Sequence, residues 1–169
     1  MPYSNFSLSR VKKEFGITTY EAKDIFAAVP ELPCTQHLTD TLNYHVPIAL
    51  ASNSEKARSE MIITPILMEL RKQLNEQINL FSGVEFNVDN SRELNGVCDF
   101  IVTKSDEKLF ISAPVITLVE AKKENLNAGL GQCIAEMLAA QIFNQQEGQE
   151  NITIYGSVTS GTNWKFLCL

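Results

Sequence analysis

The sequence predicts an α/β fold in which a mixed central sheet is flanked by helices, with extra helices at the N-terminus. The chain has 169 residues, of which 44% are hydrophobic and 20% are charged, so one core of ordinary size is expected. Beyond about residue 50, the spacing of apolar residues is helical, then strand-like, then helical and finally strand-like again. This order is typical of a sheet covered by helices.

The first 50 residues are expected to form a helical extension packed on a main domain that spans residues 51–169. Prolines and a glycine interrupt this extension, so its helices should be short. The expected elements are a helix over 4–15, a second helix over 19–28, a loop over 29–36 and, over 37–46, a weak helix at most.

The main domain is expected to begin with a long helix that runs from Ser52 to about Ile78. Ser52 and Glu55 form a capping-box pattern, and Pro65 predicts a kink. A second helix is predicted over 126–146, where glycines and alanines allow close approach to a sheet. The predicted strands cover residues 84–88, 97–103, 109–111, 115–122, 152–158 and 164–169.

Composition and charge exclude several classes of protein. The apolar runs are far shorter than the roughly 18 residues that a membrane-spanning helix needs, so no membrane partner is expected. The net charge of −6 argues against a protein that coats nucleic acid by bulk charge. The N-terminus has no apolar leader and the four cysteines form no C-x-x-C pair, which favours a cytoplasmic protein with reduced thiols.

The most informative feature is Asp99, an acid inside the apolar run 97–103, followed later in the chain by Glu120 and Lys122. A buried, ionised carboxylate is normally paired, hydrogen-bonded or bound to a cation. Because side chains alternate along a strand, Glu120 and Lys122 project from the same face. If the two strands are neighbours, Asp99 lies beside Glu120, and the pair offers the oxygen ligands that Mg²⁺ or Mn²⁺ prefers.

Such a site has the components of phosphodiester hydrolysis. A divalent cation held by Asp99 and Glu120 would polarise a phosphodiester and acidify a bound water. The ammonium of Lys122 would hold that water as hydroxide and offset the negative charge that develops on the phosphorus centre. The residues therefore predict metal-dependent cleavage of a phosphodiester.

The order of Asp99 and then Glu120-x-Lys122, between a helix with Glu60 and a helix with Gln132, resembles the PD-(D/E)XK nuclease superfamily. The resemblance implies a restriction-endonuclease-like αβββαβ core. It implies Mg²⁺ or Mn²⁺ as the cofactor, with Glu60, Asp99 and Glu120 as metal ligands and Lys122 as the residue that positions the attacking water. Gln132 stands where some exonuclease branches place a catalytic glutamine.

The resemblance covers roughly residues 52–169 and has two departures. Cys98 replaces the proline that gives the superfamily its name, and Glu136 stands where the exonuclease branches have a tyrosine. The second departure means that the exonuclease subtype is not carried over. The expected activity is a nuclease, endo or exo, that acts on DNA rather than RNA and is able to work as a homodimer.

Other interpretations stay open at this stage. Asp99, Glu120 and Lys122 also fit a structural ion-pair cluster, and Glu60 also fits a pair with Arg71 on the same side of its helix. The alternative function is a catalytically silent module that binds a protein or nucleic-acid partner.

Two roles are possible for the aromatic residues in the last predicted strand. Trp164 and Phe166 alternate with Lys165, which fits either base stacking or the edge of a core.

Overall fold

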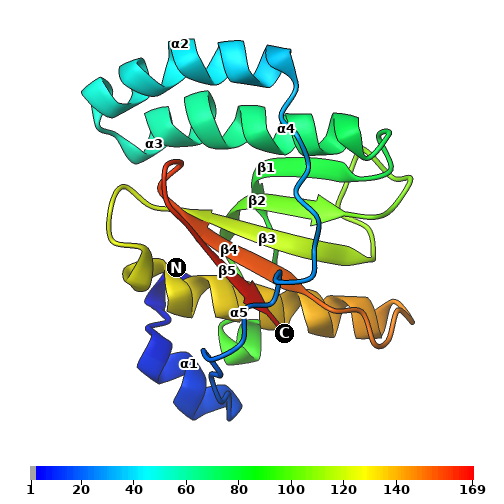
Figure 1. Ribbon diagram of the computed structural model, residues 1–169. Coiled ribbons are helices and arrows are strands. Elements are labelled where there is room, and N and C mark those ends of the chain that lie inside the picture. Colours follow the sequence, from blue (N-terminus) through cyan, green and yellow to red (C-terminus); the bar gives the residue numbers. More distant parts are fainter. Residues whose placement is uncertain (1–2) are drawn as a thin grey trace.

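The central sheet has five strands in the order β1-β2-β3-β4-β5, and helices cover both of its faces (Figure 1). This computed structural model describes residues 3–169 and confirms the predicted α/β class with a mixed, helix-flanked sheet. The strands are β1 (Asn79–Glu85), β2 (Val97–Thr103), β3 (Val115–Ala121), β4 (Tyr155–Thr159) and β5 (Trp164–Cys168).

The directions of the strands follow from their connections. β1, β2 and β3 form an antiparallel meander, and β5 pairs antiparallel with β4 at the edge of the sheet. β3 and β4 run parallel, and they are joined by α5 (Leu126–Gln146), which crosses one face of the sheet. A parallel pair requires such a crossover, and the predicted helix over 126–146 supplies it.

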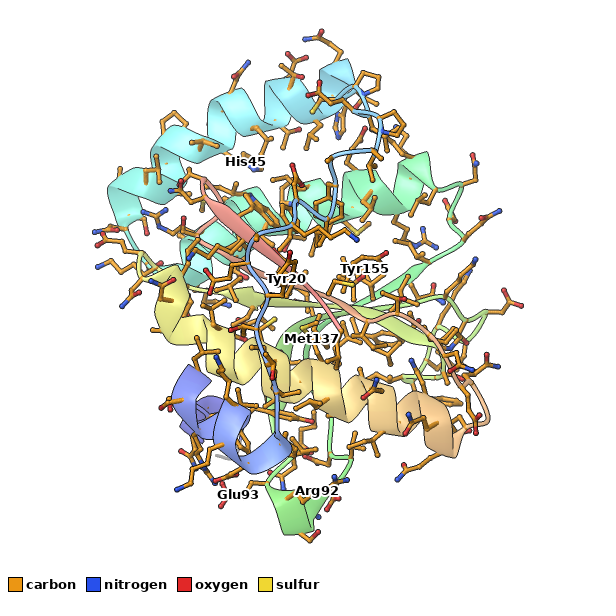
Figure 2. All side chains as sticks on the ribbon, turned by 60° about the horizontal axis from the view of Figure 1, so that its bottom comes forward. Tyr20, His45, Arg92, Glu93, Met137 and Tyr155 are labelled. Atoms are coloured by element: carbon orange, nitrogen blue, oxygen red, sulfur yellow. The ribbon has the colours of Figure 1, made fainter. Side chains whose placement is uncertain are left out.

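Small residues let α5 lie close to its neighbours. A Cβ on Gly131 would come within 2.3 Å of the backbone oxygen of Phe6, and one on Gly156 of β4 would come within 2.3 Å of Met137 Sδ. Figure 2 shows Met137 on the side of α5 that faces the sheet. Gly131 is therefore required by close packing against backbone, whereas a side chain at Gly156 would require Met137 to move.

The N-terminal residues are part of this core. A 3-10 turn (Tyr3–Asn5) and α1 (Leu8–Phe15) pack against α5, and Tyr3, Phe6 and Val11 are buried among the core residues. The Tyr3 hydroxyl donates a hydrogen bond to the carbonyl of Phe86 at 2.7 Å. The described chain forms no helix over 19–28, so that prediction is wrong, and this segment crosses the sheet without regular structure.

The helix α2 (Gln36–Ser52) is longer than expected, and the prediction of only a weak helix over 37–46 is wrong. Thr35 caps it, because the Thr35 side chain accepts a hydrogen bond from the backbone of Leu38. Packing against the following helices stabilises it despite Pro47 in its interior. The expected domain boundary after residue 50 lies inside α2.

The first helix of the main domain begins later than predicted. Ser52 ends α2, Asn53 adopts the left-handed conformation, and Ser54 is the residue that caps the next helix. That helix consists of α3 (Glu55–Arg58), a π-helical turn (Ser59–Ile63) and α4 (Thr64–Gln73). The sequence predicts a kink at Pro65; the irregularity in the structure is the π turn over Ser59–Ile63, and Pro65 lies in the first turn of α4.

Two strand predictions are wrong in detail. β1 spans Asn79–Glu85 instead of 84–88, because Phe86 and Val88 pair with the turn that leads into β2. The predicted strand over 109–111 is irregular, and Leu109 and Phe110 are exposed.

Within residues 3–169, no helix is both long and apolar enough to cross a membrane. The four cysteines are free.

Candidate active site

Asp99 near the start of β2 and Glu120 near the end of β3 lie close enough for the charge of Asp99 to act on Glu120. The register pairs Phe100 with Val119, and continuing it by one residue places Asp99 opposite Glu120. The regular ladder stops there, and Asp99 Oδ2 accepts a hydrogen bond from the backbone N–H of Ala121 at 2.8 Å. A side-chain carboxylate thus replaces a backbone acceptor where the two strands separate.

Glu120 is buried, with 1% of its surface exposed. Its Oε1 accepts a hydrogen bond from Lys122 Nζ, whereas its Oε2 is buried and has no hydrogen-bond partner. Burial and the nearby charge of Asp99 raise the pKa of Glu120 to about 8, against the opposing effect of Lys122. A buried carboxylate with an unpartnered oxygen is costly unless something else binds it.

Lys122 is held in place by its backbone and by its side-chain stem. Its N–H donates to the carbonyl of Thr159 at 2.8 Å, which extends the pairing of β3 with β4. Its stem lies against the first turn of α5, where a Cβ on Gly129 would be 3.1 Å from Lys122 Cγ and Cε. Burial lowers the pKa of Lys122, but the hydrogen bond and charge of Glu120 outweigh burial and raise it.

A second buried acid, Glu136, lies behind the strand ends on α5. It is fully buried; its Oε1 accepts a hydrogen bond from Gln132 Nε2 at 3.1 Å, and its Oε2 has no partner. Burial, followed by the charge of Glu120, raises the pKa of Glu136. Sequence reasoning treated Glu136 only as a departure from a motif. The signal that identified Asp99, an acid within an apolar run, also applies to Glu136.

The helix before the sheet brings Glu55 and Glu60 to the same side as Asp99. Glu60 lines a cleft of about 260 Å³ together with Asp99, but its side chain is 59% exposed and forms an ion pair with Lys56 at 2.7 Å. Arg71, the alternative partner, pairs with Glu76 instead. It is Glu55 whose charge acts on both Glu120 and Lys122, a relation that the sequence analysis missed.

The described residues therefore gather Asp99, Glu120, Lys122 and the Gln132–Glu136 pair, and they leave Glu60 at the rim. Within residues 3–169, no three Asp, Glu, His or Cys side chains form a ready-made metal centre. Mg²⁺ usually binds through one or two carboxylates and keeps several waters. The unpartnered Oε2 of Glu120, next to the charge of Asp99, fits that requirement.

Comparisons with known proteins found no matching family model, no matching curated protein and no matching solved structure.

Proposed function

We propose that this chain is a divalent-metal-dependent nuclease of the PD-(D/E)XK type, which hydrolyses DNA in preference to RNA. The observation that carries the proposal is the pair of carboxylates on neighbouring strand ends, with a buried unpartnered oxygen on Glu120 and a lysine two residues beyond it. The succession of a helix, three strands, a crossover helix and a parallel strand supports a restriction-endonuclease-like core.

Asp99 and Glu120 would hold Mg²⁺ or Mn²⁺. When bound, a divalent cation polarises the scissile phosphate and lowers the pKa of a coordinated water. Asp99 is fixed for this role by its hydrogen bond to the Ala121 N–H. Glu120 is fixed by burial and by Lys122.

Lys122 would orient the attacking water and offset negative charge on the phosphate. Its ammonium contacts Glu120, one of the two residues that would hold the cation, so it is available to orient a water there and to offset negative charge. The Gln132 side chain donates to Glu136, which leaves its amide oxygen available as an acceptor. Glu60 and Glu55 would act through waters at the rim of the cleft, since both are exposed.

The net charge of −6 should lower the affinity for DNA. Phosphates are repelled at long range by an acidic protein, so affinity should be modest and strongly dependent on divalent ions and on salt. A chain that requires a cation at its site would use that cation to offset part of this repulsion.

A cleavage assay with a matched pair of lysine variants tests the proposal. Labelled single- and double-stranded DNA and RNA are incubated with Mg²⁺ or Mn²⁺ and with wild type, Lys122→Met or Lys123→Met. Lys123 is the control because it is the next residue along the chain and is exposed in the bend after β3. We expect cleavage of DNA that falls by about 100-fold or more in Lys122→Met and stays near wild type in Lys123→Met.

Equal cleavage by both variants, or no cleavage by wild type, would contradict the nuclease proposal. Calorimetric binding of Mn²⁺ without any cleavage would instead favour a catalytically silent binding module.

A further inference from the structure

We propose that the cleft at the start of α5 and the aromatic side chains of β5 form a track for single-stranded DNA. The proposal rests on the nuclease function above and names the form of its substrate. It is carried by a second cleft, by a lysine and an asparagine that are hydrogen-bonded in it, and by a continuous set of aromatic rings, in which Trp164 is half-buried and the others are exposed.

This second cleft is the larger of the two described here, with a volume of about 440 Å³, and the proposed metal ligands take no part in it. It lies between the loop that follows β3 and the turn that precedes β5. Its lining is mostly polar and comprises Glu124, Asn125, Leu126, Asn127, Asn163, Trp164 and Lys165. Its nearest link to the active site is Lys122, which precedes Glu124 by two residues and packs on the first turn of α5.

The cleft contains groups that suit a sugar-phosphate backbone. Lys165 Nζ donates to Asn127 Oδ1 at 2.7 Å, so the side chain is held at the cleft wall by a neutral partner. Asn125, the residue before α5, makes no capping hydrogen bond with its side chain. Glu124 is the opposing charge in the lining, and it is exposed to solvent, where its repulsion of a phosphate is screened.

Aromatic rings extend from the cleft along one face of β5 and β4. The rings of Trp164 and Phe166 are stacked, with centroids 6.1 Å apart and an angle of 14° between them. Phe26 packs edge-on against Phe166 at 5.1 Å and stacks with Tyr155 at 6.5 Å. Phe26 belongs to the segment between α1 and α2, which crosses in front of β4 and β5 in Figure 1, and Tyr155 is labelled in Figure 2.

These rings keep much of their surface open. Phe166 is 54% exposed, Tyr155 is 42% exposed and Phe26 is 37% exposed. Bases stack on exposed aromatic rings whatever their sequence, provided that they are not already paired in a duplex. Lys165 projects from the face of β5 opposite to Trp164 and Phe166, so the cleft and the open rings meet at the edge of the sheet. A polar cleft and open rings that meet there fit a single strand better than a duplex or an apolar protein surface.

The intrinsic fluorescence of Trp164 gives a direct test, because it is the only tryptophan in the chain. The protein is titrated in EDTA, where cleavage is blocked, with an oligothymidylate of about ten nucleotides. We expect saturable quenching of the tryptophan emission. The matched duplex, an abasic strand of the same length and inorganic phosphate should quench weakly or not at all.

Phe166→Ala and Lys165→Gln should each weaken binding of the oligothymidylate by about tenfold. Tyr44→Ala is the control, since Tyr44 is an exposed aromatic residue on α2 outside the track. Circular dichroism establishes that each variant is folded. Absence of quenching by the single strand, equal quenching by the duplex, or equal binding by all three variants would overturn the track.

Failure of the track and failure of the proposed function give different results. Quenching by the single strand without cleavage in Mg²⁺ or Mn²⁺ would support the track and contradict the nuclease. Cleavage that depends on Lys122 but is unaffected by Phe166→Ala, without any quenching, would support the nuclease and contradict the track.

Discussion

Two buried polar positions on α5 show how differently a protein treats a structural group and a reactive one. Asn144 is buried, yet every hydrogen bond that it offers to β3 is made: its Oδ1 accepts from the Val115 N–H at 2.8 Å, and its Nδ2 donates to the Val115 carbonyl at 2.7 Å. Glu136, two helical turns earlier, is equally buried but keeps an oxygen without a partner. The same is true of Glu120 in β3.

This difference in hydrogen bonding distinguishes the two ends of β3. Most buried polar groups that serve stability are satisfied within the fold. The exceptions beside β3 are neutral hydroxyls, Thr103 Oγ1 opposite Val115 and Ser157 Oγ in β4, whereas Glu120 and Glu136 are acids. Carboxylates that stay partly unsatisfied at the opposite end of the same strand cost free energy, which a bound cation would return. We infer that the Asn144 end of β3 is structural and that the Glu120 end is functional.

The largest expected effect on stability is at the structural end. Asn144→Leu removes both hydrogen bonds to Val115 and leaves a buried N–H and a buried carbonyl unpaired. We expect the free energy of unfolding to fall by about 2–6 kcal/mol. Urea denaturation measures this loss. If the folded variant binds Mn²⁺ as the wild type does, the Asn144 end and the Glu120 end of β3 are independent. Weaker Mn²⁺ binding by the folded variant would contradict the division of β3 into a structural and a functional end.

Stability of the metal-free protein should fall as the pH rises. The raised pKa of Glu120, about 8, means that the folded state holds a proton that the unfolded state releases above its ordinary value near 4.5. Between these two values, the folded state binds more protons, so the free energy of unfolding decreases with pH, by up to about 5 kcal/mol for the 3.5 pH units between 4.5 and 8. Thermal unfolding in EDTA from pH 5 to pH 8.5 measures this slope. The slope should be smaller in Glu120→Gln. An unchanged slope would argue against a raised pKa of Glu120 in the folded protein.

The smallest expected effect is an increase in stability in Glu136→Gln. Glutamine keeps an acceptor for Gln132 and cannot ionise, so the folded protein at pH 8 no longer holds a buried acid with a raised pKa. The expected stabilisation is about 1 kcal/mol, or a rise in Tm of roughly 2–4 °C. Gln132→Ala is the control, since it removes the partner and keeps the acid. A loss of stability in Glu136→Gln would show that this carboxylate is structural after all.

Local sequence patterns predicted the elements that surround the site. Nearly continuous apolar runs identified β2 and β3, because a central strand is buried on both faces. The small residues of 126–146 identified α5, because they allow a helix to pack closely against a sheet. The acid within the apolar run of β2 also identified Asp99. These signals need no knowledge of what lies across the sheet.

Features set by distant contacts could not be predicted in the same way. Ser52 and Ser54 both fit a cap, and the left-handed Asn53 that ends α2 decides between them. Glu60 and Arg71, which fitted a pair on one side of a regular helix, bind other partners, because a π turn begins at Ser59 and changes the spacing. The proximity of Glu136 to Glu120 depends on how α5 crosses the sheet, which no local pattern encodes.

Calorimetric titration with Mn²⁺ tests the central claim most directly, because it measures binding at the strand ends without requiring a substrate. Wild type and the double variant Asp99→Asn, Glu120→Gln are compared at pH 8, with Glu60→Gln as a matched control at the rim. We predict one saturable site in the wild type, no such site in the double variant and at most a modest loss of affinity in Glu60→Gln. Binding that survives in the folded double variant, or its absence from the wild type, would contradict the account.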